Sequence, residues 1–208
     1  MELRTESDRL RTWAEKVEDR SDAWERAYPN WIVAHAAVER FLANDPDPDE
    51  EEIADLLFLL ARDNDAHFVA DLLADAQRAG LAVARAGLGY DDFEARWQIA
   101  SYLGGFVDDE SKQILRDFVE DAHEYVRRNA LVSLRSRDPS FAERVARDWI
   151  KSEHAYSRLA AIIVLHELGS SHLSKALRAL REDPFEHVRN KVRELSARVT
   201  ERPREAEA

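Results

Sequence analysis

The stretches EYVRRNALVSL (124–134) and AYSRLAAIIVL (155–165) carry one apolar pattern twice, and EHVRNKVREL (186–195) carries most of it a third time. In each stretch an alanine or valine stands three residues after the leading arginine, and the first two stretches add a leucine seven residues after it. One pattern that recurs at a fixed period of roughly 20–50 residues indicates a repeat architecture. The leading arginines, with a fourth before them, stand 31 residues apart at Arg96, Arg127, Arg158 and Arg189.

The repeating register continues through a break in the chain within each unit. Apolar residues return 18, 19 and 22 positions after the first three arginines, at Ile114, Leu115, Phe118, Val145, Ala146, Trp149, Ala176, Leu177 and Leu180. Each unit is therefore two amphipathic helices, which cannot bury their apolar faces alone. We expect an all-α fold, an α-solenoid of antiparallel helix pairs with repeats of about 31 residues.

The chain divides by its pattern into three segments of one continuous domain. The regular repeats cover residues 91–199. Residues 1–90 are predicted to be an acidic helical extension, which either continues the repeats in degenerate form or covers their end. Residues 200–208 are predicted to be a disordered tail, because the last apolar position of the pattern is Val199.

Turn and cap signals divide the N-terminal extension into helices. We expect a helix over 5–27 and a second one that begins at Pro29. Asp47 or Asp49 can cap the next helix, which carries IADLLFLLA (53–61) and is apolar nearly all round, so it is expected to lie beneath others. A further helix pair is expected over 67–86, interrupted at Gly80.

The three stretches quoted first resemble HEAT repeats, in particular the short HEAT-like units of the phycobilisome lyases, over about residues 91–199. In that family an aspartate six residues before the arginine helps to form a ladder between repeats. Asp121 and Asp183 hold this position, whereas Ser152 and Tyr90 replace it in the other two units. The resemblance implies a fold but no activity, because such repeats serve scaffolds, enzymes and inhibitors alike. It implies a structural ladder of Arg96, Arg127, Arg158, Arg189, Asp121 and Asp183.

The resemblance also implies that the helices that begin near the four arginines line the concave side, which is the usual binding surface of solenoids. Residues one and five positions after each arginine should face away from the helix-pair core, and several of them are large and apolar. The alternative for Trp97, Leu159 and Ile163 is packing against neighbouring units or the N-terminal helices. The candidate partner-binding residues are Trp97, Arg128, Val132, Arg135, Leu159, Ile163 and His166.

Charge is unevenly distributed along this chain of 208 residues, whose net charge is −12. Residues 1–90 carry 10 basic and 20 acidic groups, and residues 91–208 carry 20 and 22. An acidic surface repels phosphate, so nucleic acid is not expected as a partner, whereas a basic protein would be attracted. The alternative is that the acidic residues only keep the protein soluble.

Sequence signatures of chemistry are few. The chain has no cysteine and no P-loop, dinucleotide or hydrolase motif, so we expect no cofactor. His123 and His154 occupy equivalent repeat positions, yet a metal site needs more ligands, and we expect none. Asp148 beside Trp149 resembles the aspartate and tryptophan of HEAT-like DNA glycosylases for alkylated bases, although Trp149 also fills an apolar repeat position.

These observations favour a non-catalytic adaptor or regulatory solenoid of bacterial type that binds a protein partner through its concave helices. One alternative is an immunity or inhibitor protein that neutralises a basic toxin. The other is the glycosylase, which the acidic composition disfavours. No apolar run reaches the roughly 18 residues of a membrane span, and the start MELRTESDRLRTW (1–13) has no apolar stretch, so we expect a cytoplasmic protein. The oligomeric state stays open.

Overall fold

The computed structural model describes residues 2–21 and 24–201, and every regular element in these two ranges is helical. The all-α prediction is therefore confirmed for the described residues. Two short 3₁₀ segments, η1 (Trp24–Ala27) and η2 (Leu103–Gly105), accompany the α-helices. These are α1 (Glu2–Ala14), α2 (Trp31–Leu42), α3 (Glu50–Arg62), α4 (Phe68–Asp75), α5 (Gln77–Gly87), α6 (Phe93–Tyr102), α7 (Asp109–Phe118), α8 (Glu124–Arg137), α9 (Pro139–Trp149), α10 (Ala155–Glu167), α11 (Leu173–Ala179) and α12 (Glu186–Glu201).

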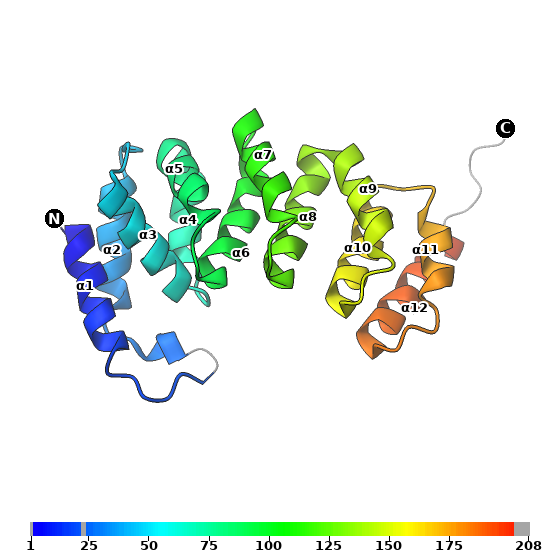
Figure 1. Cartoon of the computed structure of the whole chain (residues 1–208), viewed down its shortest axis with the longest axis horizontal. Coiled ribbons are helices and arrows are strands. Elements are labelled where there is room, and N and C mark those ends of the chain that lie inside the picture. Colours follow the sequence, from blue (N-terminus) through cyan, green and yellow to red (C-terminus); the bar gives the residue numbers. More distant parts are fainter. Residues whose placement is uncertain (1, 22–23, 202–208) are drawn as a thin grey trace.

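Consecutive helices pack in pairs, and the pairs follow one another along the long axis of the molecule from the N-terminus to the C-terminus (Figure 1). We call the even-numbered helices, α2 to α12, the even row, because each of them packs on the next even-numbered helix. The odd-numbered helices pack on one another only from α1 to α7, whereas α7, α9 and α11 make at most marginal contact with each other. The even row is therefore the continuous layer of the fold.

Side-chain caps begin several helices where the sequence places aspartates. Asp49 caps α3, since its carboxylate accepts from the N–H of Glu52 while the Glu52 side chain accepts from the N–H of Asp49. Of the two predicted capping residues, Asp49 is the one used. Asp92, Asp108 and Asp138 cap α6, α7 and α9 by accepting one backbone N–H each, without the reciprocal bond that Glu52 makes to Asp49.

Helix α3 lies under several others, as its apolar sequence predicts. Leu56, Leu57, Leu59 and Leu60 are all buried, and the helix contacts α1, α4, α5 and α6. These leucines belong to one buried apolar cluster that extends from α1 to α12, so a single core runs through the described chain.

Two predicted helix boundaries in the N-terminal extension were wrong, and most of the predicted tail lies outside the described residues. The first helix ends at Ala14 rather than near residue 27, and the chain then folds back so that Trp24 stacks on Trp13 at 5.6 Å. The predicted pair over 67–86 breaks at Ala76 rather than at Gly80, which lies inside α5. The final helix reaches Glu201. The rest of the expected tail, residues 202–208, lies outside the described residues.

Candidate functional site

Each of the four repeating arginines makes the same pair of contacts with its own unit. Nη1 donates to the backbone carbonyls six and five residues earlier, at 2.5–3.0 Å in every case. These bonds tie the first turn of α6, α8, α10 and α12 to the loop that precedes it. The acceptors are Tyr90, Asp91, Asp121, Ala122, Ser152, Glu153, Asp183 and Pro184.

Two of these arginines also hold an aspartate of the following unit by two parallel hydrogen bonds. Arg96 donates to Asp121 at 2.8 and 3.2 Å, and Arg158 donates to Asp183 at 2.6 and 2.8 Å. The second pair is almost sealed from solvent, with side-chain exposures of 9% and 2%. Its hydrogen bonds lower the pKa of Asp183 and raise the pKa of Arg158. Both pairs join neighbouring units.

The lowered pKa of Asp183 predicts an acid-dependent effect of Asp183→Asn. Arg158 favours the carboxylate, so this pair contributes stability above the ordinary aspartate pKa of about 3.8, and the contribution disappears as the pH falls through the lowered folded value. The free energy of unfolding of Asp183→Asn, measured with urea between pH 7 and pH 3, should fall furthest below that of wild type at neutral pH. A difference that stays constant down to pH 3 would contradict the pairing.

Aromatic contacts link the neighbouring helices of the even row from α2 to α8. His35 of α2 stacks on Phe68 of α4 at 4.6 Å, and His67, the residue that precedes α4, meets Trp97 of α6 edge-on at 5.1 Å. Trp97 in turn meets Tyr125 of α8 at 5.3 Å. We call this series, with Tyr156 of α10 at its end, the aromatic track. Tyr125 and Tyr156 share one repeat position, whereas Trp97 stands at another.

Arg128 bridges the last two rings of the aromatic track. Its guanidinium lies 4.3 Å from the ring centre of Tyr125 and 5.5 Å from that of Tyr156, within the range of cation–π attraction. No carboxylate of the described residues pairs with it, whereas Arg135 on the same helix pairs with Glu167. Both tyrosines are exposed, at 36% and 43%. The donors of Arg128 are therefore positioned by the rings and are not used by another charge.

The other predicted contact residues differ in what they offer. For Trp97 the structure favours the alternative of packing against neighbouring helices, because the side chain is 8% exposed and donates from Nε1 to Glu94 at 2.7 Å. It is buried because rings from both neighbouring even helices cover it. Val132 is 37% exposed, and Leu159 packs partly against the core. Ile163 and His166 are half-buried.

The two tyrosines of the Arg128 cluster were not predicted from the sequence. Tyr125 and Tyr156 both stand two residues before a repeating arginine, so the repeat register could have identified them. The positions one and five residues after the arginine, from which most of the contact residues were predicted, do not include them. We call Arg128, Tyr125, Tyr156 and Val132 the Arg128 cluster: the two tyrosines and Val132 are exposed, and Arg128 is half-buried between the rings.

A small pocket of about 210 Å³ at α2 and the end of α3 was also not predicted. Here Nε2 of His35 lies 3.1 Å from the buried Asp63, and its ring is stacked between Trp31 and Phe68. A carboxylate that orients an imidazole is an arrangement used in general bases. Glu25 lines the same pocket, and burial raises its pKa. His35, Asp63 and Glu25 come from separate elements far apart in the sequence, so no local motif identifies them together.

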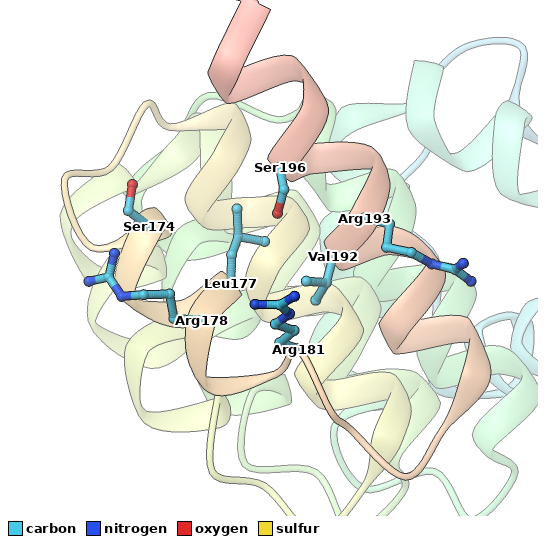
Figure 2. Close-up of a pocket in the computed structure, with 7 residues that line it drawn as sticks. All are labelled: Ser174, Leu177, Arg178, Arg181, Val192, Arg193 and Ser196. Carbon is cyan, nitrogen blue, oxygen red and sulfur yellow. The ribbon is translucent and has the colours of Figure 1, made fainter.

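A shallow pocket of about 440 Å³ lies between α11 and α12, with Leu177 and Val192 at its floor (Figure 2). Arg178, Arg181 and Arg193 surround it. Figure 2 shows that the three guanidinium groups spread apart, and Arg193 points away from the other two. These charges do not converge on one point, so the pocket is not built to hold a single anion.

The residues considered for metal binding or base excision make other contacts in the structure. His123 stacks on Phe93 at 3.8 Å, whereas His154 lies 3.4 Å from Glu124. Among the described residues no group of three or more His, Asp or Glu side chains is placed to hold a metal ion. Trp149 packs partly against the core, whereas Asp148 is exposed.

No protein-family model matches this chain, and no curated protein shows significant similarity to it. None of the described helices is both long and apolar enough to cross a membrane. The geometry of the even row therefore carries the functional argument.

Proposed function

We propose that this protein is a short HEAT-like solenoid, with repeats of about 31 residues, that binds another protein through the even row. The four arginines that recur every 31 residues make the same backbone contacts in four successive units, which supports the repeat length. Contact along the whole even row, together with separation of α7, α9 and α11, supports a curved array whose concave side is the even row.

The observation that carries the proposal is the Arg128 cluster. Tyrosine, tryptophan and arginine dominate binding hot spots, because they offer large contact area and several donors at a small entropic cost. Arg128 is held between two exposed tyrosines and has no carboxylate partner among the described residues. The exposed apolar Val132 lies one turn further along α8. A partner that covers these rings would take the free donors of Arg128.

The acidic extension adds a second property to the proposed adaptor. Residues 1–90 carry 20 acidic groups against 10 basic ones, so they attract a partner whose surface is basic and speed the encounter. The docking contacts at α8 and α10 then supply the specificity. The protein acts in this proposal as a non-catalytic adaptor or regulator.

We expect Arg128→Glu to lower the affinity for the partner about 30-fold or more, which is the effect of losing a hot-spot contact. The partner would be captured from the native host, purified and titrated by calorimetry. Arg144→Glu is the matched control, because Arg144 also lies over an aromatic ring, that of Phe141 at 4.9 Å, but on the odd-numbered helix α9. Equal affinity of the Arg128→Glu and Arg144→Glu variants would refute docking on the even row.

A further inference from the structure

Among the described residues, the ladder of arginines and aspartates is open at Arg127. Arg96 and Arg158 each hold an aspartate 25 residues later, but the residue 25 positions after Arg127 is Ser152. No carboxylate of the described residues pairs with Arg127. Its Nη1 is used by two backbone carbonyls at 2.7 and 3.0 Å, as in the other units. The edge formed by Nε and Nη2, which binds the aspartate elsewhere, is left without a protein acceptor among these residues.

The loop at Ser152 has the same turn as the loops that carry the ladder aspartates. Asp121 and Asp183 each accept the N–H of the residue two positions later, at 2.7 and 2.9 Å. The Ser152 hydroxyl accepts the corresponding N–H of His154 at 3.2 Å. Serine therefore keeps the turn, but its side chain lacks the carboxylate that holds the arginine in the other units.

We propose that the Nε and Nη2 edge of Arg127 binds a carboxylate that the chain itself does not supply. The two occupied ladder positions show how such a group would bind, with two parallel hydrogen bonds of 2.6–3.2 Å. The half-buried Arg127 side chain has no sealed unpartnered nitrogen, so the edge is open to solvent. The ligand is the side chain of an aspartate or glutamate in a partner, or a free small carboxylate.

This site deepens the proposed function, and it rests on that function where the carboxylate belongs to a partner protein. Arg127 is next to Arg128 in the first turns of α8, and Ser152 precedes Tyr156 of α10 by four residues. A segment of the partner protein that covers the Arg128 cluster would thus reach Arg127 with one acidic side chain. The local positive charge of two arginines without carboxylate partners contrasts with the acidic surface of the chain.

The test is an NMR titration of the arginine Nε–H signals of the full chain. The probes are acetate, the capped tripeptide Gly-Asp-Gly and its Gly-Asn-Gly counterpart. Arg127→Lys identifies the signal of Arg127. We expect a saturable shift of this signal with acetate and with the aspartate peptide, but not with the asparagine peptide. Tighter binding of the aspartate peptide assigns the site to a protein ligand, and equal binding assigns it to free carboxylates.

Ser152→Asp provides the decisive variant, because it supplies the missing carboxylate from within the chain. It should abolish the acetate-dependent shift and raise the melting temperature by about 2–4 °C. Ser152→Asn, which has the same size without the charge, should leave the shift intact. Absence of the shift in wild type, or its persistence in Ser152→Asp, would overturn the open position. Arg128→Gln, which removes the docking guanidinium without placing a carboxylate beside Arg127, should leave acetate binding at Arg127 measurable, so failure of the docking proposal is distinguishable from failure of this one.

Discussion

Replacing Arg158 with alanine is expected to destabilise the fold by about 3–5 kcal/mol, the cost of breaking a buried ion pair from one side. The variant removes the guanidinium partner of Asp183, whose side chain is 2% exposed in the wild-type structure. It also frees the backbone carbonyls of Ser152 and Glu153, which Nη1 of Arg158 satisfies. The free energy of unfolding from urea titration at pH 7 measures this loss.

Arg127→Ala is the matched control for that loss, because the two arginines make the same contacts with their own loops. Arg127 donates to two carbonyls, but no carboxylate depends on it in the described structure. Its loss should cost only about 1–2 kcal/mol, the net worth of one or two hydrogen bonds. If both variants lose the same stability, the Asp183 pair contributes nothing beyond the carbonyl contacts.

The helical units were predictable because their information is local and repeats. The spacing of the arginines and the apolar positions after them places the first turns of α6, α8, α10 and α12 in one register. The N-terminal boundaries were less predictable, because they depend on contacts between distant residues. Trp24 and Tyr28 pack on Trp13 across a loop, and no local signal in the sequence requires the first helix to end before them.

The candidate surface was predicted only in part, since the burial of a side chain depends on its neighbours in the adjacent units. Trp97 stands at an outward repeat position, yet His67 and Tyr125 cover it from both sides. His67 reaches it from a left-handed conformation, with φ of 56°, which the sequence does not reveal. Arg128 was identified because its position follows the repeat, whereas its pairing with two tyrosines depends on how α8 and α10 stack.

Gly80→Ala is expected to destabilise the protein by about 2–3 kcal/mol, although alanine normally favours an interior helical position by about 1 kcal/mol. A Cβ at this position would lie 2.4 Å from the carbonyl oxygen of Leu73 and 2.9 Å from Cζ of Phe106. The backbone cannot move away easily, because the buried Tyr102 hydroxyl donates to the Gly80 carbonyl at 2.9 Å. The glycine that suggested a helix break is thus required by the close approach of α4.

Gly89→Ala separates this steric effect from the general properties of glycine. A Cβ at Gly89 would meet no atom within 4 Å, so this change should alter the free energy of unfolding by less than about 0.5 kcal/mol. Thermal and urea unfolding of both variants measure the contrast. A Gly80→Ala protein as stable as wild type would mean that α4 and α5 can separate without cost, which contradicts their tight packing. The contrast arises because only Gly80 lies where two helix backbones meet, and there the absence of a side chain stabilises the N-terminal extension.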